Sequence, residues 1–133
     1  MDTTTLQIDT ADRPLITLDD HLAAYVGQRD DGLLNVFVPH ATAGLALIET
    51  GAGSEEDLLE LLDRLLPRDD RYRHRHGSDG HGADHVLPVV VSPAVTLPVV
   101  GGQVMLGTWQ SVVLGDLNRD NPRRTVRLSF LAG

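Results

Sequence analysis

The chain contains no cysteine and no lysine. The lack of cysteine excludes disulfide bonds, thiolate nucleophiles and metal sites built on sulfur. Because all eleven basic residues are arginine, Schiff-base chemistry, pyridoxal phosphate attachment and a phosphate-binding lysine are excluded as well. Any metal ion must therefore bind histidine or carboxylate side chains.

Positive charge is also scarce, since the net charge is −8. This balance argues against a nucleic-acid surface or an anionic membrane surface, because both kinds of binding neutralise phosphates with clustered cations. No apolar run approaches the ~20 residues of a membrane span, and the N-terminus lacks the basic and apolar segments of an export signal. We expect a cytoplasmic protein with no nucleic-acid or membrane partner.

The length of 133 residues fits one domain, residues 1–133. Residues 4–8 and 15–18 predict an N-terminal hairpin, and further strands are predicted at 33–39, 44–48, 94–100, 103–114 and 125–131. A short helix is expected from Asp19 or Asp20 to Val26. Ser54 predicts the start of one main helix with a wide leucine stripe, and Pro67 ends it. This order indicates an α+β fold with a largely antiparallel sheet.

Four of the six histidines lie within residues 72–85, in a polar stretch that begins near residue 68. Imidazole is the commonest metal ligand. His74 and His76 would point the same way in an extended segment, and His81 and His85 would share a face if their segment were helical. The alternative is a solvated loop whose histidines have no role. Residues 86–91 are compatible with either a strand or a helix.

Two other segments carry polar side chains that are candidates for a functional site. His40 stands at a strand end beside Thr42, where a structural histidine is the simpler interpretation. Glu49 follows an apolar run, so we expect it to be buried and to need a partner. Asp79 adds a carboxylate to the histidine stretch.

The last third of the chain adds a tryptophan segment and an arginine pair. Thr108 and Gln110 flank Trp109, for which core packing is the simplest explanation. Arg123 and Arg124 predict either a phosphate fork or a solvated turn.

These pieces, in this order, resemble one family, the YjbQ-like proteins described as secondary thiamine-phosphate synthases. The resemblance runs from about Leu6 to Leu131. It rests on the segments 40–49, 72–74, 79–86, 97–98, 106–110 and 122–124, together with Asp57 and Pro67. The chain departs from the family pattern at Ala41, where threonine is usual, and at Thr50 and His81, where asparagine is usual.

The resemblance implies a curved antiparallel sheet, a homotrimer and a polar site near the subunit boundary. The implied reaction joins a hydroxymethylpyrimidine diphosphate to a thiazole phosphate and releases pyrophosphate, so a small phosphorylated metabolite is the expected partner. By resemblance and residue chemistry, the predicted site residues fall into three groups. They are Glu49, Asp79, Thr108 and Gln110 for catalysis, Trp109, Arg123 and Arg124 for substrate binding, and His40, His74 and His85 for a metal.

Zinc or magnesium is the expected divalent cation. Magnesium usually accompanies diphosphates, whereas imidazole-rich sites favour zinc. The alternative function is a non-catalytic trimer that binds a metal or a small anion. A cupin-type metalloenzyme ranks last, because the His74-x-His76 motif is not followed by the required glutamate.

Overall fold

The computed structural model describes all 133 residues. Its elements are, in chain order, β1 (Asp2–Asp9), β2 (Leu15–Thr17), α1 (Asp19–Val26), β3 (Gly32–Phe37), β4 (Ala43–Ile48), α2 (Ser54–Leu65), α3 (His81–Asp84), α4 (Leu87–Val90), β5 (Ala94–Val100), β6 (Gln103–Val104), β7 (Ser111–Asp116) and β8 (Arg123–Ala132). None of the helices combines the length and apolar composition needed to cross a membrane.

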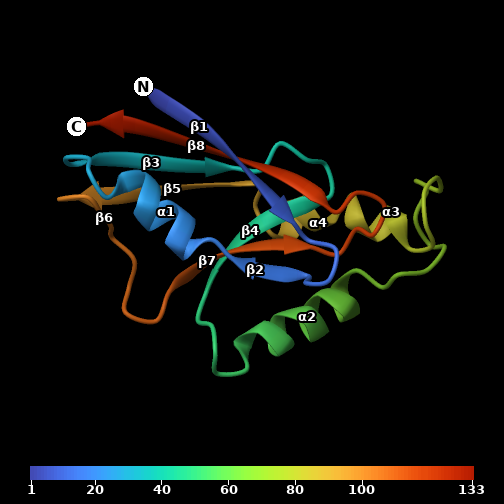
Figure 1. The fold of residues 1–133 in the computed structure, drawn as a ribbon. Coiled ribbons are helices and arrows are strands. Elements are labelled where there is room, and N and C mark those ends of the chain that lie inside the picture. The colour runs from blue at the N-terminus through green and yellow to red at the C-terminus, as the bar shows by residue number, and fades with distance from the viewer.

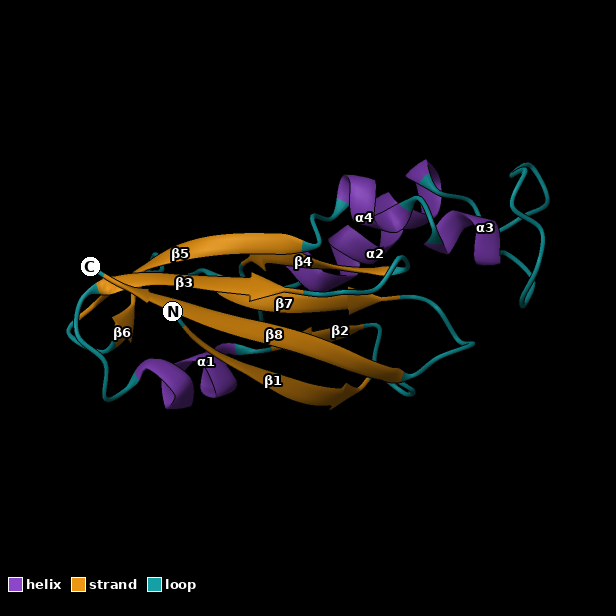
Figure 2. Cartoon of the chain, turned by 90° about the horizontal axis from the view of Figure 1, so that it is seen from above, coloured by secondary structure: helices purple, strands orange, loops and turns teal.

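The strands form two antiparallel sheets. One sheet has five strands in the order β1-β8-β3-β5-β6, and the other has three in the order β2-β7-β4. Figure 1 shows the sheets stacked as layers, with α2 below the three-stranded sheet. Figure 2 shows the five-stranded sheet curving across the molecule with no helix in front of it. The structure confirms the predicted α+β fold with a curled antiparallel sheet.

The main core lies between the two sheets and contains seventeen buried apolar residues. Strand β8 shows how the sequence builds it. Val126, Leu128 and Phe130 are buried, whereas the residues between them are at least partly exposed. This alternation follows from the two-residue period of a strand, which sends successive side chains to opposite faces.

A smaller core holds the helices together and positions the histidine stretch. Leu62 and Leu66 at the end of α2 pack with Ala83, Leu87 and Val91. The leucine stripe is narrower than predicted, since Leu61 and Leu65 of the same helix are 43% and 54% exposed.

Two strand predictions were wrong. β1 and β2 do not form a hairpin, because β1 pairs with β8 and β2 pairs with β7. The turn between them instead carries the chain from one sheet to the other. The strand predicted at 103–114 is broken after Val104, and a turn follows in which Gln110 Oε1 accepts a hydrogen bond from Gly107 N–H at 2.8 Å.

The segment that the sequence left ambiguous is helical. Residues 81–84 and 87–90 form two short helices, α3 and α4. Pro88 lies in the first turn of α4, where its missing N–H costs no hydrogen bond because the first donors of a helix have no partner within it. The helical turn of α3 is the condition under which His81 and His85 share a face.

Candidate metal centre

Two glycines let α3 approach the preceding loop. Gly80 has a φ of +78°, a left-handed conformation that side chains other than glycine rarely adopt. A Cβ on Gly82 would lie 2.5 Å from Cβ of Tyr72 and 2.8 Å from the carbonyl oxygen of His74. Only glycine therefore allows α3 to lie so close to this loop, and the contact brings His81 and His85 opposite His74.

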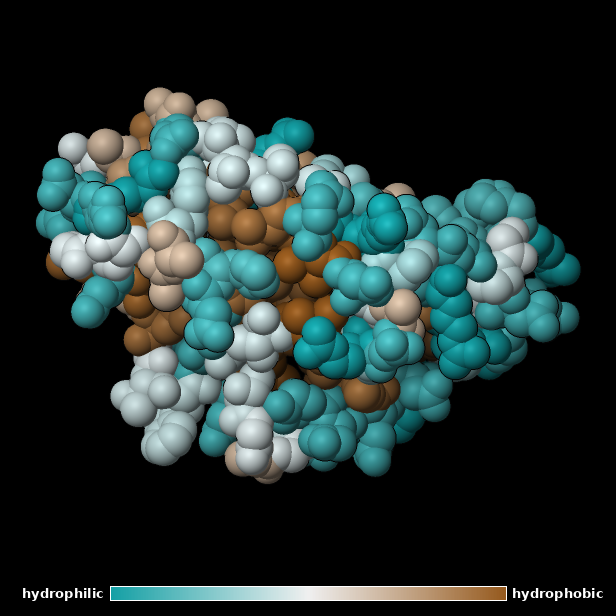
Figure 3. All heavy atoms as spheres, in the orientation of Figure 1, coloured by the Kyte–Doolittle hydropathy of each residue, from teal (hydrophilic) through white to brown (hydrophobic).

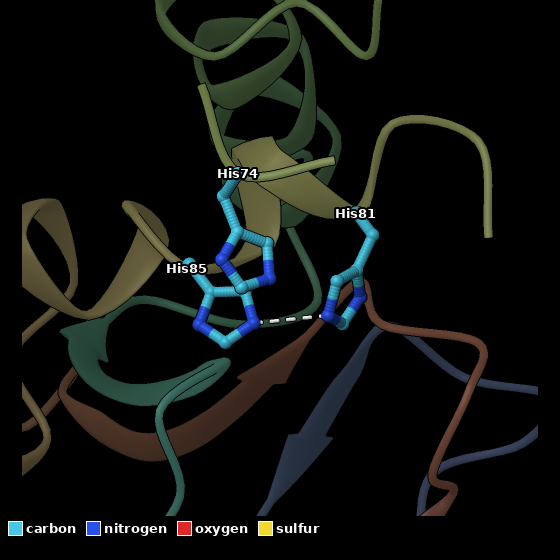
Figure 4. A group of neighbouring side chains, drawn as sticks. All are labelled: His74, His81 and His85. Carbon is cyan, nitrogen blue, oxygen red and sulfur yellow. Dashed lines mark hydrogen bonds between the residues drawn. The ribbon is translucent and has the colours of Figure 1, made fainter. Parts of the chain in front are cut away.

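Three histidines converge at this contact. One ring nitrogen from each of His74, His81 and His85 lies within 4.8 Å of those of the other two. The Nε2 atoms of His81 and His85 are 2.9 Å apart, and the ring centroids of His74 and His85 are 4.0 Å apart. Figure 4 shows the three rings turned toward one another, with His74 coming from the loop and the other two from the α3 segment. We call these three residues the histidine group.

Carboxylates lie behind the histidine group. Nδ1 of His81 is 3.1 Å from Oδ2 of Asp120 and 3.8 Å from Oδ2 of Asp84. Asp84 is almost fully buried and binds both terminal nitrogens of Arg68. Asp120 also accepts a hydrogen bond from Ser78 N–H at 3.0 Å. Carboxylates in this position typically orient a metal-binding imidazole through its second nitrogen.

The surroundings favour the neutral forms of His74 and His85 and the charged form of Asp120. Burial lowers the pKa of His74, and the neighbouring rings of His76 and His81 lower it further. Burial and the same cluster of rings also lower the pKa of His85. The Ser78 hydrogen bond lowers the pKa of Asp120. At neutral pH the two histidines therefore keep free lone pairs that can bind a cation.

The residues present fit a metal ion that prefers nitrogen ligands. Nε2 of His74 is buried and has no hydrogen-bond partner, which is costly unless another group satisfies it. Two nitrogens bound to one tetrahedral zinc lie roughly 3.3 Å apart, given Zn–N bonds of about 2.0–2.1 Å. That separation falls between the 2.9 Å and 4.8 Å seen here. Small ring rotations would thus accommodate zinc, whereas magnesium prefers oxygen ligands.

A polar cavity of about 340 Å³ adjoins the histidine group. His74 and His81 line it together with Arg68, Arg75 and Asp79. Figure 3 shows hydrophilic side chains over this end of the molecule and hydrophobic ones in the middle of the same face. Arginines beside a cation site favour an anionic ligand.

Two residues predicted for this site lie elsewhere. The structure does not bring His40 into the histidine group. Instead, His40 Nε2 accepts a hydrogen bond from Thr125 N–H at 2.8 Å. Arg124 is 2% exposed, and its Nε donates to Oδ2 of Asp116 at 2.7 Å. The predicted phosphate fork is therefore wrong for Arg124, because its guanidinium is already paired inside the protein. Arg123 is exposed.

The remaining predicted residues are on the surface. Glu49 is exposed, contrary to expectation, because β4 ends at Ile48 and the chain turns away there. Trp109 is 73% exposed rather than packed in the core, and Thr108 and Gln110 are exposed beside it. None of these four lines the histidine cavity. Of the predicted catalytic residues, only Asp79 does.

Sequence reasoning did not select three residues that the structure places at the site. His81 could have been chosen from its four-residue spacing to His85, which brings both onto one helical face. Asp120 had no comparable signal, because it reaches the site from the loop after β7. Arg68 is one of several arginines at the start of the polar stretch, and nothing in the sequence distinguishes it from the others.

Comparisons with known protein families and with related sequences identify the same family, UPF0047. A family model described as UPF0047 protein YjbQ-like matches residues 4–133. The UPF0047 protein Rv2556c of Mycobacterium tuberculosis is 68% identical over 133 residues, which cover the full length of both chains. A UPF0047 protein of Archaeoglobus fulgidus is 32% identical over 91% of this chain and 95% of its own. A crystal structure of a hypothetical protein from Aeropyrum pernix has a TM-score of 0.87 at 28% identity, with 100% of both chains covered.

Proposed function

Because the chain belongs to the YjbQ-like UPF0047 family, we propose for it a function built on the histidine group: it binds a zinc-like divalent cation there and acts on a small phosphorylated metabolite. The convergence of three ring nitrogens within 4.8 Å is the observation that carries this proposal. Arg75 in the adjoining cavity supplies positive charge for the phosphate.

The reaction to test first is the condensation implied by the family resemblance. A carbon–oxygen bond to the diphosphate breaks, the electron pair leaves with the diphosphate, and the thiazole nitrogen forms the new carbon–nitrogen bond. A bound divalent cation would neutralise the charge that develops on the leaving diphosphate. Arg75, which lines the cavity and forms no ion pair, would supply positive charge beside it. No covalent nucleophile is needed, which suits a chain without cysteine and lysine.

The experiment combines metal analysis with an assay of pyrophosphate release. Protein purified without a histidine tag is analysed for bound metal, stripped, reloaded with zinc or magnesium, and supplied with both phosphorylated substrates. We expect about one zinc per chain, and turnover that depends on it. If the stripped protein does not bind added zinc, the proposed metal site is wrong. If the zinc-loaded protein releases no pyrophosphate from the two substrates, the proposed synthase reaction is wrong.

One observation favours the alternative function, a binding protein without turnover. Glu49, Thr108 and Gln110 are exposed and do not line the histidine cavity, so within one chain the cavity lacks most of the proposed catalytic groups. Replacing Glu49 with Gln tests this point, because a proton-transfer group typically contributes ~10²–10⁴-fold in rate. Full turnover in Glu49→Gln would remove Glu49 from the mechanism.

A homotrimer is the assembly that we propose for this chain, and it would cover a face that one chain leaves exposed. The outer face of the five-stranded sheet has no covering helix, and Leu33 and Leu131 are 45% and 55% exposed on paired strands. Burying such a face against another copy removes apolar surface from water. Light scattering should give three times the 14.4 kDa of one chain, and a monomeric mass at micromolar concentration would reject the trimer.

A further inference from the structure

The loop that joins β7 to β8, residues 117–122, leaves the buried pair of Asp116 and Arg124, reaches the histidine group and returns. Asp120 in this loop is the carboxylate that lies 3.1 Å from Nδ1 of His81. The side chain of Asp120 is 35% exposed. Packing alone therefore does not fix it, and hydrogen bonds must hold it beside the imidazole.

Two successive hydrogen bonds between backbone and side chain shape the loop. The N–H of Asn118 donates to Oδ1 of Asp116 at 3.0 Å, and the N–H of Asp120 donates to Oδ1 of Asn118 at 3.0 Å. Each bond closes an Asx turn, in which a short side chain accepts from the backbone two residues further on. Asn118 joins the two turns, and the second turn sets where the backbone of Asp120 lies.

Asn118 is itself held by buried groups. It is 9% exposed, and its amide nitrogen donates to Oγ1 of Thr42 at 3.2 Å. The same oxygen accepts from Arg124, whose guanidinium also binds both oxygens of Asp116. Because a buried polar network whose members are paired is rigid, these groups give Asn118 a fixed frame.

The other side of Asp120 is fitted just as closely. Oδ2 of Asp120 accepts a hydrogen bond from Ser78 N–H at 3.0 Å. A Cβ on Gly77 would lie 2.7 Å from this oxygen and 2.9 Å from Cδ2 of His81, so a larger residue would leave no room for the carboxylate and the imidazole together. A small displacement of Asp120 would therefore break its contact with His81.

The spacing Asp116-x-Asn118-x-Asp120 also occurs in calcium-binding loops. Calcium would need the carboxylate oxygens of Asp116 as ligands, but Arg124 and Thr10 already bind them. The side chains of Asp116 and Asn118 therefore shape the loop rather than bind a cation.

We propose that Asn118 is a positioning residue for the histidine group: it holds Asp120 where the carboxylate selects the His81 tautomer with its hydrogen on Nδ1. This tautomer leaves a lone pair on Nε2, the nitrogen that lies 2.9 Å from Nε2 of His85, and a metal ligand needs that lone pair. The use of the lone pair for zinc rests on the function proposed above. The tautomer itself does not, because it exists in the metal-free protein.

Nitrogen NMR of the metal-free protein tests the tautomer at about pH 8, where histidine side chains are largely neutral. The chemical shift of each ring nitrogen shows whether it carries the hydrogen, and we expect Nδ1 of His81 to carry it in the wild type. Asn118→Ala should move His81 toward the tautomer with the hydrogen on Nε2. Asn118→Ser should restore the wild-type form in part, because a serine hydroxyl makes the same turn more weakly.

Asn121→Ala is the matched control. Asn121 is exposed in the same loop, and its Oδ1 accepts a hydrogen bond from Arg123 N–H, again two residues further on, at 3.2 Å. This variant removes an Asx turn that does not involve Asp120, so the His81 tautomer should stay as in the wild type. Urea denaturation shows which variants are folded. If Asn118→Ala is not, Asn118→Ser, with its weaker bond, should still show a mixture of tautomers.

Zinc affinity gives a second measurement. Asn118→Ala should lower it about threefold to tenfold, because the outer partners of a metal ligand typically matter ~10–100-fold and Asn118 acts through one of them. In the Asp120→Asn background, Asn118→Ala should have no further effect, since residues that act through one contact are not additive. A merely structural role for Asn118 would give the same loss in both backgrounds.

The two measurements separate this inference from the proposed function. The positioning role is wrong if His81 carries its hydrogen on Nε2 in the wild type, or if the folded Asn118 variants keep the wild-type tautomer. It is also wrong if Asn121→Ala changes the tautomer as much as they do. If the stripped protein does not bind zinc but only the Asn118 variants change the tautomer, the metal function is wrong and the positioning role stands.

Discussion

The protein has two clusters of polar side chains, and they differ in how fully their atoms are paired. Around Arg124, the guanidinium binds both oxygens of Asp116 and the hydroxyl of Thr42. In the histidine group, by contrast, Nε2 of His74 is buried without a hydrogen-bond partner, and the Nε2 atoms of His81 and His85 face only each other. One cluster satisfies its members within the chain, and the other leaves ligand atoms free.

The difference separates a structural role from a functional one. A buried charge is tolerated when it is paired and hydrogen-bonded, and the Arg124 cluster meets that condition. An unpaired buried nitrogen costs free energy in the folded protein, so its presence in the histidine group is explained when a ligand supplies the partner. His40 belongs with the first cluster, and His74 and His85 with the second.

The largest expected effect is on stability. Arg124→Met leaves the carboxylate of Asp116 buried and unpaired, and we expect a loss of about 3–5 kcal/mol in the free energy of unfolding. Urea denaturation measures it, with Arg127→Met as the control because Arg127 is exposed on the same strand. If Arg124→Met unfolds like the wild type, the paired cluster is not structural.

Next comes the loss of a metal ligand. Replacing either His74 or His85 with Ala should lower zinc affinity by more than the ~10–100-fold typical of losing a supporting hydrogen bond, with little change in the melting of the metal-free protein. His76→Ala is the control, because His76 lies 3.9 Å from the His74 ring, centroid to centroid, but is not in the histidine group. Unchanged zinc affinity in both ligand variants would contradict a shared metal site.

A smaller effect should come from the carboxylate behind His81. Asp120→Asn keeps an acceptor for Ser78 N–H but removes the charge that faces Nδ1 of His81, so zinc affinity should fall about tenfold. Asp79→Asn is the matched control, since Asp79 is an exposed carboxylate of the same cavity. Equal zinc affinities in the two variants would show that Asp120 does not orient the ligand.

The smallest effect should be a pH dependence. Burial and the charge of Arg124 lower the pKa of His40 from its usual 6.5, against the opposing influence of Asp116. The unfolded state therefore binds a proton more readily than the folded state, and the stability present above pH 6.5 is lost as the pH falls below it. His40→Gln retains an acceptor for Thr125 N–H without titrating.

Denaturant unfolding between pH 7.5 and 5 checks this expectation. The free energy of unfolding of the wild type should fall more steeply toward acid pH than that of His40→Gln. Parallel curves would mean that His40 does not contribute to acid sensitivity.

The sequence alone determined much of the fold. Two-residue alternation located most strands, and Ser54 and Pro67 bounded α2 as predicted, because these signals act within a few residues of chain. The sequence did not predict the pairing of the N-terminal strands correctly. Strand β1 pairs with β8, which lies at the opposite end of the chain. Pairing over such separations depends on which apolar faces share a core, and local patterns do not encode that.

For the candidate site, too, some features could be predicted from the sequence and others depended on tertiary structure. Clustering of four histidines located the site in the sequence, because metal ligands often lie close together in the chain, and the family resemblance singled out His74 and His85 among them. Tertiary structure decided that the His81 segment is helical, that Asp120 lies beside His81, and that His40 lies apart from the histidine group. Gly82 lets α3 pack against the loop, and the loop after β7 carries Asp120 to His81. The burial that made Arg124 structural and left Glu49 exposed likewise arose from packing between elements, which no single segment specifies.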